Sequence, residues 1–144
     1  MTTAQVGSLA AIQAIGFETA DLVKLTSNQI KSLTVAAVAG LTTGQIAALG
    51  SDQLNSLTTT QIAGLTNAQI AALTSDQVGA LATGQFRALG VAQIASLTTA
   101  QASNISTAQL ASITADQMRA LSTADVAKLT TTQLAALSLS LIHI

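Results

Sequence analysis

The chain has 144 residues, of which 49% are hydrophobic, 8% are charged and only 1% are aromatic. Five Lys and Arg against six Asp and Glu give a formal net charge of −1, which excludes the basic surface of a nucleic-acid-binding or membrane-surface protein. The sequence has no cysteine, which excludes disulfides and thiolate metal sites, and no stretch is apolar for long enough to predict a transmembrane helix. The start, MTTAQVGSLA, lacks the pattern of a signal peptide, so we expect none in this segment.

A period of eight residues runs from end to end without insertion or deletion, which divides the chain into 18 octads. Position 1 is large and apolar in all 18 octads, and position 6 is a second apolar site. Position 5 is Gln in 14 octads, and position 2 is Thr or Ser in 13. Self-similarity at a fixed period is typical of repeat architectures. We therefore predict one domain, residues 1–144, built as an octapeptide-repeat solenoid.

The first octads, residues 1–40, contain two of the exceptions to this pattern. Octad 1, MTTAQVGS, is near consensus and offers no distinct terminal cap. At position 5, Asp21 and Ala37 replace Gln. We expect Asp21, like Asp125 further on, to take the place of the glutamine at a helix N-terminus.

The interior octads, residues 41–120, show the repeated phrase most clearly, as in LTNAQIAALTSDQVGA over residues 65–80. Thr at position 2 and Gln at position 5 form the S/T-x-x-Q capping box, which starts a helix. The residues that follow, Q-I-A-A-L, are mostly good helix formers. Each octad therefore predicts one helix of under two turns that begins after position 2. Residues 41–80 and 81–120 also share features 40 residues apart, such as Gly44 and Gly84, which suggests duplication.

Two other architectures agree less well with this pattern. In one continuous helix the apolar stripe would drift by about 80° per octad, so no straight partner could cover it. A β-solenoid conflicts with apolar spacings of five and three, although the Thr, Ile and Val content keeps it as the alternative. The expected fold is all-α, a solenoid or superhelix with one very short helix per octad.

A single octad cannot fold alone. Burial of one Leu and one Ile contributes roughly 3–6 kcal/mol, whereas ordering eight residues costs on the order of 12 kcal/mol. The octads must therefore stack, with Leu65 and Ile70 in the core and small residues at positions 7 and 8 where coils meet. The sequence leaves open whether two, three or four octads make one turn.

The last octad, residues 137–144, reads LSLSLIHI and lacks the Thr and Gln pattern. This departure is also typical of a non-native appended tail. Its apolar residues predict an exposed adhesive patch and self-association through the ends of the solenoid. They are Leu137, Leu139, Leu141, Ile142 and Ile144.

The residues that could carry chemistry are few and scattered, so we expect no catalytic, cofactor-binding or metal-binding residue and no enzyme. His143 is the only histidine and lies next to the last residue. Asp52, Asp76 and Asp116 share position 4, where a carboxylate suits a helix N-terminus. The basic residues at position 7 indicate that this position faces solvent. They are Lys31, Arg87 and Arg119.

Nearly the whole chain resembles the L-T-x-x-Q-[IV]-A-A-L octad tracts of very large bacterial surface or secreted proteins, which are labelled adhesin-like, haemagglutinin-like or haem-utilisation. The resemblance implies a rod-like spacer or display segment without catalysis, at the cell surface or outside a bacterium. The alternative is a binding module that presents a regular Thr/Ser/Gln face to a carbohydrate, a protein partner or ice. A binding face requires exposed Thr hydroxyls, whereas in a spacer the hydroxyls are used as helix caps.

Overall fold

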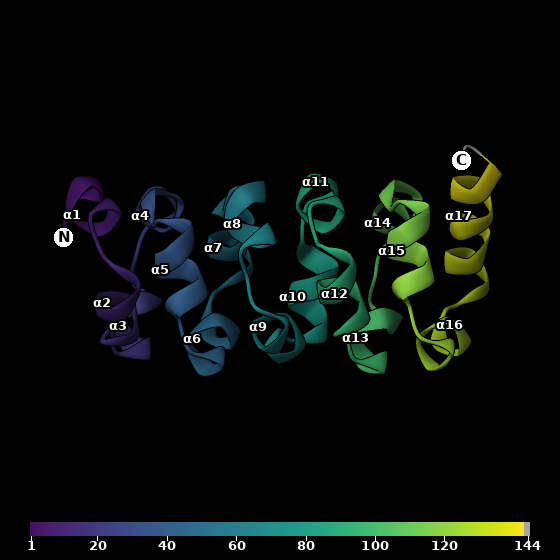
Figure 1. Ribbon diagram of the computed structural model, residues 1–144, viewed down its shortest axis with the longest axis horizontal. Helices are drawn as coiled ribbons and strands as arrows, with labels where there is room; N and C mark the ends of the chain where they lie inside the picture. Colours follow the sequence, from purple (N-terminus) through teal and green to yellow (C-terminus); the bar gives the residue numbers. More distant parts are fainter. Residues whose placement is uncertain (143–144) are drawn as a thin grey trace.

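The computed structural model describes the backbone of residues 1–142 and the side chains of residues 1–10 and 12–137. Over these residues the chain forms 17 helices and no β-strand, which confirms the all-α solenoid and excludes the β-solenoid there. The helices follow one another along an elongated body, with the first and the last helix at opposite ends (Figure 1).

Each helix but the last occupies one octad, as the sequence predicts. The first 16 helices contain between four and six residues, and the last contains 12. In chain order the helices are α1 (Thr3–Gly7), α2 (Ala11–Ile15), α3 (Thr19–Leu22), α4 (Ser27–Ser32), α5 (Val35–Gly40), α6 (Thr43–Ala48), α7 (Ser51–Ser56), α8 (Thr59–Ala63), α9 (Asn67–Ala72), α10 (Ser75–Ala80), α11 (Thr83–Arg87), α12 (Val91–Ala95), α13 (Thr99–Ser103), α14 (Thr107–Ser112), α15 (Ala115–Ala120), α16 (Thr123–Lys128) and α17 (Thr131–Ile142).

The helices are short because each octad both starts and stops one. Helix α9 starts at Thr66, which is in the extended conformation and caps the helix with its hydroxyl. It stops at Leu73, which leaves the helical conformation with φ −59° and ψ 143°. The next residue, Thr74, is the extended cap of α10. A new cap eight residues later thus prevents the helix from running on.

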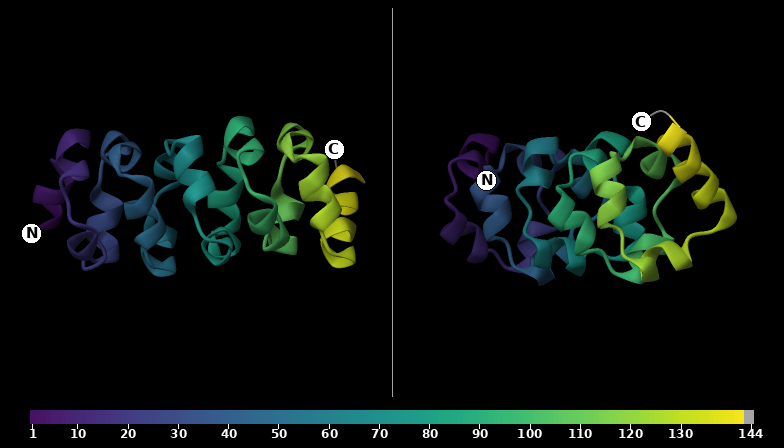
Figure 2. Two further views of the ribbon diagram at one scale, coloured as in Figure 1. Left: turned by 90° about the horizontal axis from the view of Figure 1, so that it is seen from below. Right: turned by 45° about the vertical axis from the view of Figure 1, so that its right-hand side comes forward.

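Between three and four octads make one coil of the solenoid. Each helix packs against the helix three places further on, as α1 does against α4 and α6 against α9. Helices α1, α4, α8, α11 and α14 reach the same long edge in turn, in steps of three or four (Figure 1). Two further views show the same progression along the body (Figure 2). The two-octad coil that the sequence left open is therefore excluded.

The core is built from positions 1 and 6 of the octad, as predicted. Leu65 is 4% exposed and Ile70 is 1% exposed. The largest side chain in the core is Phe86, at position 6 of its octad. The apolar side chains from successive coils form one continuous cluster from Val6 to Leu137.

The last helix departs from the rule of one helix per octad. Helix α17 continues through position 1 of the final octad because LSLSLIHI offers no Thr and Gln pair that would start a new helix. Leu137 is buried, so the prediction that it contributes to an exposed patch is wrong. The side chains of Leu139, Leu141, Ile142 and Ile144, which were assigned to the same patch, lie outside the described residues, as does His143.

None of the described helices combines the length and the hydropathy that a membrane-spanning helix requires.

Candidate functional site

The most regular polar arrangement among the described residues is the capping box at the start of most helices. In α9 the Thr66 hydroxyl accepts a hydrogen bond from the Gln69 backbone N–H at 3.2 Å. The Gln69 side-chain Oε1 accepts one from the Thr66 N–H at 2.8 Å. This reciprocal pair satisfies two of the N–H groups that a helix N-terminus leaves without intrahelical partners. The sequence therefore predicted the role of the glutamine oxygen correctly.

The glutamine nitrogen has a second role, which links one coil to the preceding one. Gln69 Nε2 lies 2.7 Å from the Leu41 carbonyl oxygen and 3.0 Å from that of Val38. These carbonyls belong to the C-terminal end of α5 and the residue that follows it, and the Val38 carbonyl also accepts from the Leu41 N–H. One amide therefore caps the start of its own helix and the end of a helix in the coil before.

The same bond recurs at twelve glutamines, each of which donates to the carbonyl 28 residues earlier. Apart from the bond of Gln29 to the Met1 carbonyl, the distances lie between 2.5 and 2.8 Å. Among the described residues, every buried side-chain nitrogen and oxygen atom has a hydrogen-bond partner. We call this set the glutamine ladder. It consists of Gln29, Gln45, Gln53, Gln61, Gln69, Gln77, Gln85, Gln93, Gln101, Gln109, Gln117 and Gln133.

Sequence reasoning missed the ladder, although the residue type carried a signal. Glu and Gln serve equally well as the acceptor in a capping box. Position 5 nevertheless contains 14 glutamines and no glutamate. Only the amide also donates a hydrogen bond, because an ionised carboxylate is an acceptor alone. The absence of Glu at position 5 therefore indicates that the side-chain N–H of Gln donates to an acceptor outside its own capping box.

The hydroxyls at position 2 are used as helix caps, which is the arrangement expected of a spacer. Each accepts a hydrogen bond from the backbone N–H three residues on. Residues at position 3, for example Thr43, Thr59 and Thr83, are also exposed, and their hydroxyls are not the helix caps. The capping residues are Thr2, Thr26, Thr34, Thr42, Thr58, Thr66, Thr74, Thr98, Ser106, Thr114, Ser122 and Thr130.

The exceptions at position 5 behave differently from one another. Asp125 is 2% exposed and forms the capping box with Ser122, as expected. Asp21 forms no capping box because position 2 of its octad is Glu18, which makes no side-chain cap bond, and Asp21 faces Lys24 at 3.5 Å instead. Both residues therefore lie in the first turn of their helices, as predicted, but only Asp125 forms the capping box. Ala37 leaves only the Thr34 half of the box.

Replacement of Asp125 by Gln should stabilise the protein. The new amide can donate to the Leu97 carbonyl, which lies 28 residues earlier and has no amide opposite it in the ladder. One added hydrogen bond contributes about 1 kcal/mol, which raises the melting temperature by about 2–4 °C in a domain of this size. Differential scanning calorimetry measures the shift. Asp125→Glu has the same added length without a donor, so it should not stabilise. Equal effects of Gln and Glu would contradict the proposed role of the amide.

Apart from the buried Asp125, the charged side chains of the described residues are exposed, and two ion pairs join residues three positions apart. Asp52, Asp76 and Asp116 occupy the first turns of their helices, as predicted. Asp116 pairs with Arg119, and Asp76 accepts a hydrogen bond from Asn104 at 3.1 Å. Within the described residues, no group of three His, Cys, Asp or Glu side chains is placed to hold a metal ion. The position 7 residues Lys31, Arg87 and Arg119 are exposed, which confirms that prediction.

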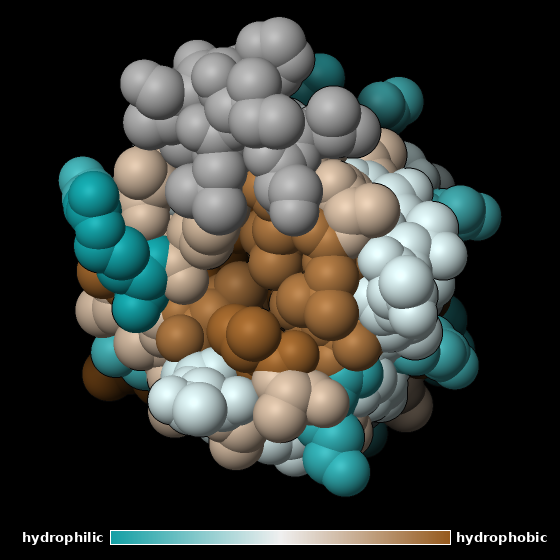
Figure 3. Space-filling view, turned by 90° about the vertical axis from the view of Figure 1, so that its right-hand side faces the viewer, coloured by the Kyte–Doolittle hydropathy of each residue, from teal (hydrophilic) through white to brown (hydrophobic). Residues whose placement is uncertain are grey.

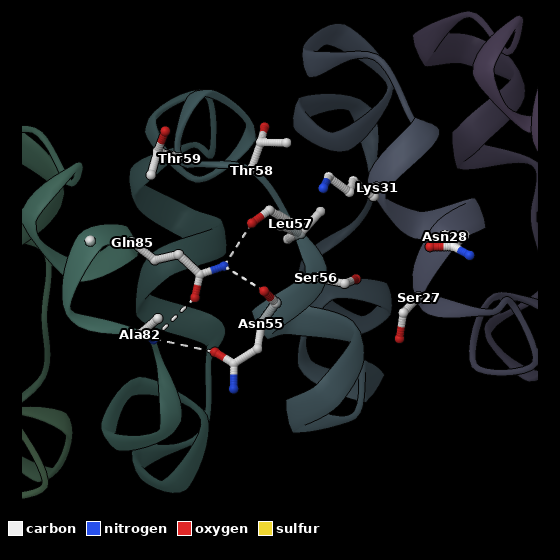
Figure 4. Close-up of a pocket in the computed structure, with 11 residues that line it drawn as sticks. Ser27, Asn28, Lys31, Asn55, Ser56, Leu57, Thr58, Thr59, Ala82 and Gln85 are labelled. Atoms are coloured by element: carbon white, nitrogen blue, oxygen red, sulfur yellow. Dashed lines mark hydrogen bonds between the residues drawn. The ribbon is translucent and has the colours of Figure 1, made fainter.

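An open groove crosses neighbouring coils between α4, α7 and the starts of α8 and α11 (Figure 4). Here the Asn55 side chain accepts a hydrogen bond from the Ala82 N–H, which also bonds to Gln85. Gln85 reaches the carbonyls of Asn55 and Leu57 across the groove. Seven of its eleven lining residues carry an amide or a hydroxyl, but apolar atoms form most of the lining surface. The lining residues are Ser27, Asn28, Lys31, Asn55, Ser56, Leu57, Thr58, Thr59, Ala82, Gly84 and Gln85.

Comparison with known protein families gives a match that lies within residues 15–115. A family model described as "ALTTAQ repeat" matches three times in tandem, over residues 15–51, 46–83 and 78–115. Successive matches begin about four octads apart, so the family unit is a group of octads that spans slightly more than one coil. No curated protein and no solved structure matches the chain.

Proposed function

Because this chain belongs to the ALTTAQ repeat family, we propose that it acts as a rod-like spacer that separates or displays other parts of a larger bacterial surface or secreted protein. The glutamine ladder carries this proposal. The same amide bonds join each coil to the one before from Gln29 to Gln133, beside a continuous apolar core. Both interactions act between neighbouring coils, so they oppose bending of the rod at each junction.

The use of the polar groups supports the same function. The position 2 hydroxyls bond to the backbone of their own helices, and the position 5 amides bond to the backbone of two helices. These groups therefore stabilise the rod. A binding module would have to present these hydroxyls to a ligand, whereas each of them already accepts a hydrogen bond from its own helix. The setting outside a bacterial cell or at its surface rests on the resemblance to the octad tracts of large bacterial proteins.

Distances measured along the rod test this function. The chain has no cysteine, so pairs of introduced cysteines can carry spin labels without interference. Asn28, Asp52, Ala100 and Ala124 are exposed and share position 4 of their octads. With Asn28→Cys in each pair, we expect a narrow distance distribution. Its mean should grow in proportion to the sequence separation, because the coils stack at a fixed spacing.

A flexible chain would give a different distance distribution. A flexible tether gives a broad distribution whose mean grows with about the square root of the separation. That result for the native protein would contradict the spacer function. The same labelled pairs in denaturant provide the matched control for a flexible chain.

A further inference from the structure

Long polar side chains are rare at position 7 of the octad, and three of them gather on one side of the rod. Six of the nine octads from residue 25 to residue 96 have Ala or Gly at this position, and the other three have Lys31, Asn55 and Arg87. All three are exposed, near the C-terminal ends of α4, α7 and α11. The fold brings these helices together, because each contributes residues to the open groove of Figure 4.

The two cations lie on one line along the rod. Lys31, Thr59 and Arg87 follow one another at intervals of 28 residues, the interval that the glutamine ladder spans between neighbouring coils. Lys31 and Thr59 line the groove, and their helices α4 and α8 share a long edge with α11, which carries Arg87 (Figure 1). The line therefore has a cation at each end, two coils apart, and a hydroxyl between them.

The third residue, Asn55, presents an oriented hydrogen-bond donor. Its Oδ1 accepts a bond from the Ala82 N–H at 3.3 Å, so its Nδ2 is directed elsewhere and has no acceptor among the described residues (Figure 4). Neither of the two ion pairs in the described part of the chain includes Lys31 or Arg87. No Asp or Glu lines the groove. These donors therefore suit a ligand that supplies anionic oxygen atoms as acceptors.

Neither a nucleic acid nor an extended peptide has the groups it needs here. Single-stranded nucleic acids stack their bases on exposed aromatic side chains, but Phe86 is buried and Phe17 is partly buried in another coil. An extended peptide pairs with the free edge of a sheet. The described residues contain no strand, and the Ala82 N–H already donates to Asn55 and Gln85.

A polysaccharide requires neither an aromatic stack nor a sheet edge. Its hydroxyls can exchange hydrogen bonds with the exposed side chains of Ser27, Asn28 and Thr59, and its C–H groups can contact the apolar atoms of the lining. Viewed along the rod, hydrophilic residues lie around the rim and hydrophobic residues toward the middle (Figure 3). A chain that lies along the side of the rod therefore meets polar groups.

We propose that the groove binds a linear acidic polysaccharide, with carboxylate or sulfate groups of the glycan at Lys31 and Arg87. The Asn55 amide donates to an oxygen of the same glycan. This site depends on residues that depart from the repeat, and it uses neither the capping hydroxyls nor the ladder amides. It therefore adds a binding function to the rod and does not rest on the proposed spacer function.

Isothermal titration calorimetry at low ionic strength tests the site. The probes are oligogalacturonate, which carries carboxylates, and dextran sulfate, which carries sulfates. The methyl ester of oligogalacturonate is the neutral control, and polyglutamate is the acidic peptide control. Lys31→Ala with Arg87→Ala removes both cations, and Lys24→Ala with Lys128→Ala removes the same charge outside the groove. Circular dichroism checks that each variant is folded.

We expect at least one of the two acidic glycans to bind, and its affinity to fall about ten-fold or more when Lys31 and Arg87 are replaced. The variant with Lys24 and Lys128 replaced should bind within about two-fold of the wild type, and added salt should weaken binding. The proposal is overturned if neither acidic glycan binds. Equal binding of the methyl ester or of polyglutamate, or an equal loss in the two cation variants, overturns it as well.

Asn55→Asp tests the donor separately. The aspartate retains an oxygen for the Ala82 N–H but replaces the Nδ2 donor with a second carboxylate oxygen. We expect the affinity for the acidic glycan to fall about ten-fold or more, because the donor is lost and a like charge is added. Binding equal to that of the wild type would show that Asn55 does not face the ligand, and the groove would not be the site.

Discussion

Replacement of Gln69 by Glu should destabilise the protein by about 3–5 kcal/mol, the range found when a buried charge is left without a partner. Gln69 is 2% exposed, and its Nε2 faces the carbonyls of Leu41 and Val38. Glu retains the length and the capping-box acceptor but presents an oxygen where the donor stood. Urea denaturation followed by far-UV circular dichroism measures the change, and the coils on either side of the substitution should separate first.

The matched control is the same substitution in the first coil. Gln13 occupies the same octad position and its Oε1 accepts the same bond from the backbone N–H three residues earlier, but its side chain is exposed. Gln13→Glu should therefore change the free energy of unfolding of the monomer by less than about 0.5 kcal/mol, as at other surface sites. If Glu at residues 13 and 69 has the same effect, the bond to the preceding coil does not stabilise the solenoid.

Leu65→Asp should abolish cooperative thermal unfolding. Leu65 is 4% exposed and lies in the core between neighbouring coils. Loss of its side chain alone costs about 2–5 kcal/mol, and the buried carboxylate adds its desolvation cost. Because stability is a sum of nearest-neighbour contacts, one broken junction divides the rod into two shorter stacks. Calorimetry should show a broadened transition at lower temperature.

Leu9→Asp provides the comparison, since Leu9 has the same octad position in the first coil but is only partly buried. We expect a smaller loss there, with a single transition retained. An unchanged melting temperature for Leu65→Asp would show that position 1 does not form the core, and the coil arrangement would then be wrong.

Local signals in the sequence predicted the local structure. The Thr66 and Gln69 pair fixed the start of a helix, and the apolar residues Leu65 and Ile70 fixed the core face. Both follow from rules that operate within one octad. The prediction of one helix per octad is wrong at the last octad, which has no Thr and Gln pair. There α17 continues through Leu137 because no new capping box starts another helix.

The number of octads per coil could not be predicted, because it depends on contacts between residues that are far apart in the sequence. The bond from Gln69 to Leu41 spans 28 residues. No rule of helix capping sets that separation, which follows from how the coils pack. The role of the glutamine side chains as donors could not be predicted for the same reason, because their acceptors lie in another coil. The preference for Gln over Glu shows that a donor is needed but does not identify its acceptor.

The central claim is that glutamine amides join each coil to the carbonyls of the coil before. Nuclear Overhauser effects from the side-chain amide protons of Gln69 test it most directly. We predict cross-peaks to the Hα protons of Val38 and Leu41, and slow exchange of these amide protons with solvent, because Gln69 is buried and bonded. Cross-peaks to residues about 16 positions earlier, as in a two-octad coil, or fast exchange without such cross-peaks, would contradict the account.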